Sequence, residues 1–210
     1  MQEFSKEYFR LLNDDYKSIN LTRINDYEEF KNKQIDDSIA PYEQSSIFRE
    51  GLLETGLMID VGFGGGFPIL PMAKLNPKNK FIGIETRGKK VKVVGEIAAK
   101  LSLKNVKLYH SRIENILIDK ECICTFKAVG KVNDFLSKIN TIKTIQVYFY
   151  KGPGFYELEK EQFEKAKESW KVIEEKVLRV EGVEKRYLIG FENINTTISP
   201  NNLVKLSDIL

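Results

Sequence analysis

Residues 57–68 read Leu57-Met58-Ile59-Asp60-Val61-Gly62-Phe63-Gly64-Gly65-Gly66-Phe67-Pro68. An apolar run ends in an aspartate, a tight glycine turn follows at once, and the next residues can begin a helix. This order predicts a strand that leads into a nucleoside- or phosphate-binding loop at the edge of an α/β sheet. The glycines at 62, 64 and 66 permit a positive φ and leave room for a ligand, and a proline at 68 suits the first turn of a helix.

The spacing of the glycines narrows the choice of ligand. The dinucleotide fingerprint G-x-G-x-x-G does not fit, because its last glycine would fall at Phe67. The loop is instead similar to the S-adenosylmethionine loop of Rossmann-like methyltransferases. The next predicted strand, residues 80–85, ends in Glu85, roughly 20 residues beyond the glycines, where a carboxylate can accept both ribose hydroxyls. We therefore favour a methyltransferase over a nicotinamide enzyme, and over a tight turn that binds nothing.

Composition sets broad limits on the protein. The chain has 210 residues, of which 42% are hydrophobic, enough for one domain with an appendage. A net charge of +3 means that any nucleic-acid surface must be a local patch. Cys122 and Cys124 have no further Cys or His partners, so we expect reduced core thiols and no metal. Without a signal peptide or a long apolar run, we expect a cytoplasmic protein that does not enter a membrane.

The hydrophobic pattern divides the chain into three parts. Residues 1–50 carry apolar side chains at helical spacing and predict an N-terminal helical segment. Residues 51–193 alternate strands and helices, as in a mostly parallel, Rossmann-like α/β sheet that closes with an antiparallel hairpin over 170–191. Residues 194–210 are expected to form a polar tail. This arrangement is similar to the sheet of class I S-adenosylmethionine-dependent methyltransferases, and we expect that fold class.

The residues near the expected strand ends limit the chemistry. No Asn/Asp-Pro-Pro-aromatic turn, which usually accompanies amine methylation, follows the strand that ends near residue 127. The two cysteines precede the end of their strand and are poor nucleophiles for ring-carbon methylation. His110 can act as a general base, although a strand-end histidine in a polar loop is the simpler interpretation. A purine N7 needs no base, so the pattern is compatible with ring-nitrogen methylation and with catalysis by positioning.

Basic residues gather where the sheet would bind a ligand. One run follows Glu85, and other lysines lie near the carboxyl ends of the later strands, the edge where open α/β sheets bind ligands. A crescent of cations there can hold phosphates, although an isolated basic run is more often a solvated helix face. The residues expected to bind RNA are Arg87, Lys89, Lys90, Lys92, Lys131 and Lys151.

Several segments together resemble one family, the small-subunit ribosomal RNA methyltransferase G, also called glucose-inhibited division protein B. The matching segments are Tyr16-Lys17-Ser18-Ile19-Asn20-Leu21-Thr22 (family W-N-x-x-x-N-L-T), Gln34-Ile35-Asp36-Asp37-Ser38 (H-x-x-D-S), residues 60–68 (D-V-G-x-G-x-G-F-P), Gly88-Lys89-Lys90-Val91, Ser111-Arg112-Ile113-Glu114, Lys151-Gly152 and Glu184-Lys185-Arg186-Tyr187-Leu188. The match covers nearly the whole chain.

The resemblance implies a cofactor, an acceptor and a set of site residues. The cofactor would be S-adenosylmethionine, and the acceptor would be N7 of a guanine in the 16S rRNA of the small ribosomal subunit. Apart from the resemblance, we expect the protein to be a monomer. Lys127 and Arg112 would position the reactants, with no general base. The implied cofactor-binding residues are Asp60, Gly62, Gly64, Gly66, Phe67, Glu85, Ile113, Glu114 and Lys127.

The chain also departs from the family pattern. Where the family has S-R-A, this chain has Phe126-Lys127-Ala128, so a lysine replaces a planar, bidentate guanidinium. Gln34 replaces a histidine and Tyr16 a tryptophan. Two alternatives therefore stay open. One is a non-catalytic RNA-binding or ribosome-assembly protein on a degenerate methyltransferase fold, and the other is a methyltransferase for a small molecule.

Overall fold

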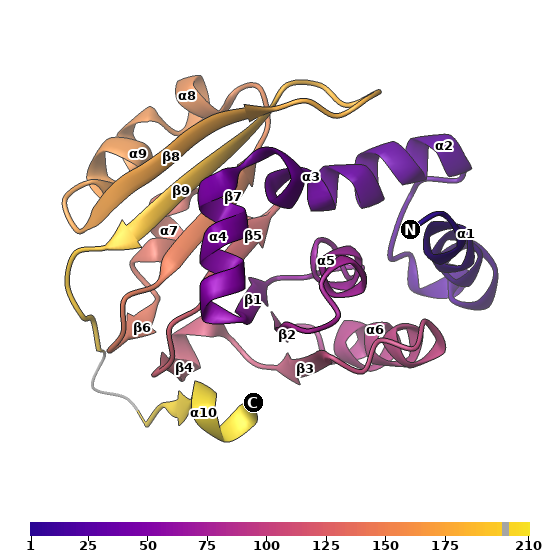
Figure 1. The fold of residues 1–210 in the computed structure, drawn as a ribbon, viewed down its shortest axis with the longest axis horizontal. Coiled ribbons are helices and arrows are strands. Elements are labelled where there is room, and N and C mark those ends of the chain that lie inside the picture. Colours follow the sequence, from indigo (N-terminus) through magenta and orange to yellow (C-terminus); the bar gives the residue numbers. More distant parts are fainter. Residues whose placement is uncertain (199–201) are drawn as a thin grey trace.

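The computed structural model describes residues 1–198 and 202–210, which contain one seven-stranded sheet and one three-stranded sheet (Figure 1). The order of the large sheet is β3-β2-β1-β5-β7-β9-β8. Its strands are β1 (Leu57–Val61), β2 (Lys80–Glu85), β3 (Val106–His110), β5 (Ile123–Lys127), β7 (Gln146–Lys151), β8 (Trp170–Leu178) and β9 (Arg186–Asn193). Neighbours from β3 to β7 pair in parallel, and β9 and β8 are antiparallel. The predicted Rossmann-like sheet with a terminal hairpin is confirmed.

Helices bury both faces of this sheet. One face packs into a single apolar cluster with α1 (Gln2–Arg10), α3 (Asp37–Gln44), α4 (Ser46–Thr55), α5 (Ile69–Leu75) and α6 (Gly88–Lys100). The other face packs with α7 (Val132–Leu136), α8 (Phe155–Leu158), α9 (Lys160–Ala166) and the 3₁₀ turn η4 (Ile113–Asn115). Alternate strand residues enter the two clusters, as the period of a strand requires. Because both faces are covered, ligands can approach the sheet only at its edges.

The first fifty residues are helical, as predicted, but not uniformly α-helical. α1 continues into the π-helical turn η1 (Leu11–Asp15) and the 3₁₀ turn η2 (Lys17–Ile19). The short α2 (Tyr27–Phe30) continues into a second π-helical segment, η3 (Lys31–Asp36), which joins α3 directly. Figure 1 shows α1 and α2 on the side of α5 and α6, away from the terminal hairpin. Such π-helical turns frequently mark functional sites.

An aromatic cluster attaches this N-terminal segment to the glycine loop. Tyr8 stacks on Phe67 with ring centroids 5.0 Å apart, and Phe30 meets both rings edge-on at 5.9 and 5.8 Å. The hydroxyl of Tyr8 donates a hydrogen bond to the backbone carbonyl of Gly65. Offset and edge-on aromatic pairs stabilise beyond the area that they bury. The loop therefore rests on α1 and α2 as well as on its own strand.

The end of the chain is more structured than the sequence pattern indicated. Within the expected polar tail, β10 (Val204–Lys205) joins β4 (Ile116–Ile118) and β6 (Asn140–Thr141) in the small sheet, and α10 (Leu206–Ile209) follows. Leu206 is fully buried, and Asp119 accepts hydrogen bonds from the backbone and side chain of Ser207. The part of that predicted tail at residues 199–201 lies outside the described residues, and the proposed domain boundaries stay predictions.

Two features of composition are visible in the fold. Cys122 and Cys124 are free, buried thiols with their sulfur atoms 3.9 Å apart. The two thiols therefore belong to the core, as expected. A separate finding is that, among the residues that the structure describes, no helix is long and apolar enough to cross a membrane.

Ser45 links α4 to the terminal hairpin, and its loss should destabilise the fold. Its hydroxyl oxygen accepts the backbone N–H of Phe48 at 3.0 Å and donates to Glu174 of β8 at 2.5 Å. We expect Ser45→Ala to lower the free energy of unfolding by about 1–2 kcal/mol, because a helix cap is lost and a partly buried hydrogen bond to a carboxylate is removed. Urea unfolding would measure the change. The exposed neighbour Ser46 provides the matched control, and equal losses for Ser45→Ala and Ser46→Ala would contradict the assignment.

Candidate functional site

A pocket of about 930 Å³ opens at the carboxyl ends of β1, β2 and β5. This edge is the expected ligand site of an open α/β sheet. The N-terminal segment and the turn of the terminal hairpin complete its walls, so the pocket joins parts of the chain that are far apart in sequence. The predicted site residues that line it are Gly62, Gly64, Phe67, Glu85, Arg87, Lys90, Arg112, Ile113, Glu114 and Lys127.

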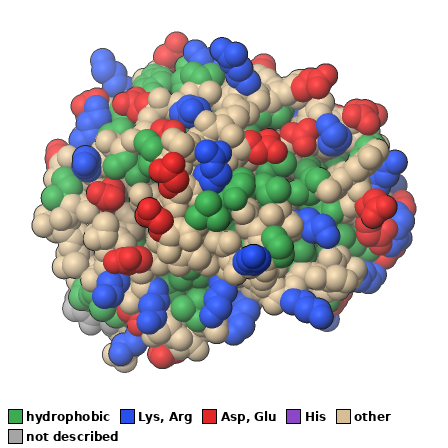
Figure 2. Space-filling view, in the orientation of Figure 1, with side chains coloured by type: hydrophobic (Ala, Val, Ile, Leu, Met, Phe, Trp, Pro, Cys, Tyr) green, Lys and Arg blue, Asp and Glu red, His purple; other side chains and the backbone are tan. Residues whose placement is uncertain are grey.

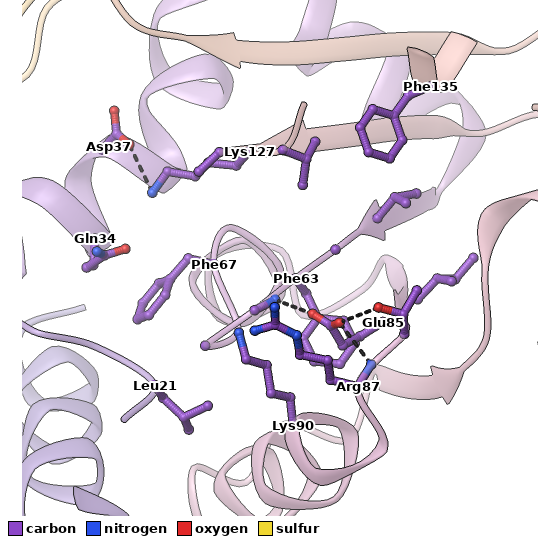
Figure 3. Close-up of a pocket in the computed structure, with 18 of the residues that line it drawn as sticks. Leu21, Gln34, Asp37, Phe63, Phe67, Glu85, Arg87, Lys90, Lys127 and Phe135 are labelled. Atoms are coloured by element: carbon purple, nitrogen blue, oxygen red, sulfur yellow. Dashed lines mark hydrogen bonds and ion pairs between the residues drawn. The ribbon is translucent and has the colours of Figure 1, made fainter. Parts of the chain in front are cut away.

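Glu85 is held rigidly at the end of β2. Its carboxylate accepts the backbone N–H of Gly64 at 3.2 Å and that of Arg87 at 3.0 Å, and the Thr86 hydroxyl donates to it at 3.2 Å (Figure 3). The side chain is buried but borders the pocket. A carboxylate fixed by backbone donors and open to a cavity on one side can accept hydrogen bonds from a pair of hydroxyls.

The glycines of the loop serve different purposes. Gly62, Gly64 and Gly66 have φ values of 74°, 56° and 96°, which confirms the predicted backbone. A Cβ on Gly64 would meet only Gly62 O and the Lys90 ammonium, at 3.8 and 3.9 Å, so it would occupy pocket space. A Cβ on Gly66 would instead collide with the Tyr8 hydroxyl. Gly66 is therefore explained by its close contact with α1, and it lies outside the lining of the pocket.

Asp60 lies beneath the pocket and does not line it. The side chain is 1% exposed and accepts the Thr125 hydroxyl at 3.0 Å. Burial raises the pKa of Asp60 to about 7, a shift that hydrogen bonds from Thr125 and the backbone of Ile69 and the positive charge of Lys127 partly offset. In this position, Asp60 connects the end of β1 to β5 through its hydrogen bond with Thr125.

The loop after β3 forms another wall. Ile113 is buried and Glu114 is half-buried, and both line the pocket. Arg112 is exposed and pairs with Glu114 at 3.1 Å. An apolar side chain next to a carboxylate suits a flat base with exocyclic donors.

The predicted RNA-binding cations are placed unequally. Arg87 and Lys90 border the pocket, whereas Lys89, Lys92 and Lys131 are exposed outside its lining. Cationic and anionic side chains are mixed over most of the face in Figure 2, so no single-sign field dominates it.

Lys151 does not fit the expectation of an RNA contact. Its side chain is 7% exposed, its ammonium pairs with Glu159 at 2.9 Å, and it donates to the Gly130 carbonyl at 2.6 Å. Burial lowers the pKa of Lys151, and the Glu159 carboxylate opposes that shift. Lys151 ties β7 to α9, and the structure offers no free ammonium there for a phosphate.

Lys127 extends from the end of β5 across the pocket to the N-terminal segment (Figure 3). Its ammonium lies 2.9 Å from the Asp37 carboxylate and 5.8 Å from the ring centroid of Phe67. Arg186 of β9 pairs with the same carboxylate at 2.8 Å. Asp37, Arg186 and Gln34 all line the pocket. None of these three residues was among the predicted site residues, although the family resemblance covers residues 34–38 and 184–188.

His110 does not line the pocket. Its Nε2 lies 2.9 Å from the Thr86 carbonyl, and its ring packs against Gly88 at the start of α6. Among the described residues, no group of three or more His, Cys, Asp or Glu side chains could hold a metal ion. The pocket itself extends along the strand ends and reaches the N-terminal segment at Leu21, Gln34 and Asp37.

The sequence of this chain is similar to those of known proteins. A model of the family described as rRNA small subunit methyltransferase G matches residues 1–189. The ribosomal RNA small subunit methyltransferase G of Histophilus somni (strain 129Pt) is 33% identical over 192 residues, which cover 90% of this chain and 85% of the relative. A protein with the same name from Streptococcus pneumoniae serotype 19F (strain G54) is 39% identical over 119 residues, 57% of this chain and 48% of the relative.

Solved structures show the same fold. A SAM-dependent methyltransferase from Aquifex aeolicus has a TM-score of 0.52 at 20% identity and covers 81% of this chain and 100% of its own. The magnesium protoporphyrin IX methyltransferase of Synechocystis PCC 6803, solved with bound SAM, has a TM-score of 0.54 at 10% identity and covers 90% and 97%. At these identities the likeness establishes the fold alone.

The buried Asp60 predicts a pH dependence of stability. Its pKa rises from 3.8 to about 7 on folding, so the folded protein retains a proton that the unfolded chain releases. Stability due to this group is therefore full below pH 4 and is lost as the pH rises to 7. Relative to Asp60→Asn, the wild type should lose on the order of 4 kcal/mol over this range.

Urea unfolding of both proteins at several pH values would measure this difference. Parallel stability curves would contradict the assignment. Thr125→Val removes a hydrogen bond that lowers the pKa of Asp60, so the pKa should rise further in this variant. The pH range over which the variant loses stability should therefore extend to higher pH than in the wild type.

Proposed function

The chain belongs to the rRNA small subunit methyltransferase G family, and on that premise we propose that it transfers a methyl group from S-adenosylmethionine to N7 of a guanine in 16S rRNA. The observation that carries the proposal is the joining of the glycine loop and Glu85 by a direct hydrogen bond within one pocket. A turn without a ligand would require neither an open space at Gly64 nor a fixed carboxylate facing it.

The donor set of the pocket fits S-adenosylmethionine. Glu85, held by two backbone N–H groups, can accept the ribose hydroxyls. The space in front of Gly62 and Gly64 admits the methionine end, with Phe67 as its apolar boundary. We place the adenine against Ile113 and Glu114. Asp60 and Gly66 stabilise this arrangement from behind without contacting the ligand.

The remaining pocket space belongs to the acceptor. The cofactor supplies an electrophilic methyl group on a sulfonium, and guanine N7 has an in-plane lone pair and loses no proton when it is methylated. This chain therefore needs to align the base, which is an entropic contribution. The major-groove edge of guanine presents O6 and N7 as acceptors. We assign to Lys127, which lines the same pocket, a hydrogen bond from its ammonium to O6 that would orient the ring.

The rim of the pocket suits the RNA backbone. We propose that Arg87, Lys89, Lys90, Lys92, Arg112 and Lys131 contact phosphates. Contacts of this kind position RNA without reading its sequence and make binding depend on salt. Lys151 is left out because its ammonium is buried and paired.

The two alternatives make different predictions for ligand binding. A non-catalytic assembly protein would bind RNA without needing the cofactor, and a small-molecule methyltransferase would not need RNA. The retained loop and Glu85 speak against the first, and the cationic rim speaks against the second. We further infer that the protein acts as a monomer in the cytoplasm, where its rRNA substrate would be found.

Methyl transfer to ribosomal particles tests the proposal directly. We expect labelled S-adenosylmethionine to mark small subunits from cells that lack this activity, with the label at a single N7-methylguanine. Digestion and mass mapping of the rRNA would identify the base. Cofactor binding without labelled rRNA would point to another acceptor. Absence of cofactor binding would favour the assembly protein.

Gly64→Asp should remove cofactor binding. The new carboxylate would occupy pocket space beside Glu85, and the φ of 56° would strain any side chain. We expect affinity for S-adenosylmethionine, measured by calorimetry, to fall at least about 100-fold, equivalent to roughly 3 kcal/mol. Gly95→Asp on α6, where an added Cβ meets nothing within 4 Å, is the control. Unchanged affinity in folded Gly64→Asp would remove the proposed cofactor site.

A further inference from the structure

A single buried carboxylate holds two cations at the acceptor end of the pocket. Asp37, at the start of α3, is 0% exposed. Lys127 reaches it from β5 at 2.9 Å, and Arg186 reaches its other oxygen from β9 at 2.8 Å. The three residues come from the N-terminal segment, the middle of the sheet and the terminal hairpin. Removing one member of such a buried cluster leaves uncompensated charge behind.

The π-helical segment η3 presents this carboxylate to Lys127. The backbone N–H of Asp37 bonds to the Asn32 carbonyl, five residues earlier, instead of the Lys33 carbonyl that an α-helix would use. The Lys33 carbonyl faces the pocket side, 3.5 Å from the Lys127 ammonium. Beyond Asp37, the Ser38 carbonyl accepts the Tyr150 hydroxyl at 3.1 Å, which fixes α3 to β7. The segment is thus anchored on both sides of the ion cluster.

Asp37 also favours the charged form of Lys127. The Lys127 side chain is 10% exposed, and its burial lowers the pKa, with Asp37 as the main opposing influence. The other groups that act on it are Arg186, which lowers its pKa further, and Asp60 beneath the loop, which raises it. Without Asp37, Lys127 and Arg186 would lose the carboxylate that pairs with both of them.

We propose that Asp37 is a positioning residue for methyl transfer: it holds the Lys127 ammonium charged and directed across Phe67 toward the acceptor base. This inference rests on the proposed function and deepens it. The N-terminal segment is then part of the transfer apparatus, since its buried carboxylate sets the state of a donor on the sheet. The same carboxylate joins α3 to β9, so a purely structural role must be separated from positioning.

Asp37→Asn tests the proposal through the pH profile of kcat for transfer to small ribosomal subunits. Loss of the charge should move the alkaline limb of the profile to lower pH by about one to three units, because an opposite charge within a few ångströms shifts a pKa by that amount. Affinity for S-adenosylmethionine should change less than about threefold, which is under 1 kcal/mol. Asp36→Asn is the matched control, because Asp36 pairs with Lys31 outside the pocket lining.

Lys127→Arg separates positioning from structure. Arginine stays charged at all accessible pH values. The variant should therefore retain the pair with Asp37 but lose the alkaline limb that belongs to Lys127. In the double variant Asp37→Asn/Lys127→Arg, the shift caused by Asp37→Asn should disappear. A shift that persists in the double variant, or an Asp37→Asn profile that matches the wild type, would overturn the proposal.

Asp37→Glu covers the case in which Asp37→Asn does not fold. It retains the charge but displaces it by one methylene, so we expect an unchanged alkaline limb and a kcat lowered at least about tenfold, or 1.4 kcal/mol. Wild-type kcat in folded Asp37→Glu would overturn positioning by Asp37. Failure of the proposed function gives a different result, because the wild-type protein itself would then leave the guanine unmethylated.

Discussion

The stacking of Tyr8 on Phe67 is the contact on which the site depends. A glycine loop with three positive φ values has little intrinsic preference for one shape. Here it is held from one side by β1 and from the other by a ring of α1, with the Tyr8 hydroxyl bonded to the Gly65 carbonyl. The Leu21 carbonyl also lies so close to Gly65 that no side chain would fit there. The N-terminal segment thus shapes the loop and walls the acceptor end of the pocket.

The buried charged groups of this protein affect the site more than its net charge does. With a net charge of +3, the surface provides no strong overall field. The influential charges are the buried ones: Asp37 between two cations, Asp60 under the loop, and Glu85 between backbone N–H groups. Electrostatic interactions are strongest where water is excluded. A few buried carboxylates can therefore set the geometry of a site whose outer rim remains solvated.

The sequence predicted what is encoded locally. The strand, glycine loop and second strand with Glu85 follow from spacing and alternation, and the structure has them as expected. The sequence pattern could not distinguish a glycine that faces the pocket from one that makes room for α1. Gly66 is of the second kind, because a Cβ there would collide with the Tyr8 hydroxyl. Lys151 looked like a surface cation because the sequence pattern did not indicate its pairing with Glu159, which lies between α8 and α9. The pairing of Asp37 with Arg186 spans 149 residues, a separation at which periodicity carries no information.

The long separation between Asp37 and Arg186 affects when the site can be completed during synthesis. Synthesis begins at the N-terminus, so the Asp37 carboxylate leaves the ribosome long before Arg186 exists to pair with it. Until β9 has emerged, one wall of the pocket is missing and the buried carboxylate has at most one of its two cations. The site is therefore complete once β9, which carries Arg186, has joined the sheet.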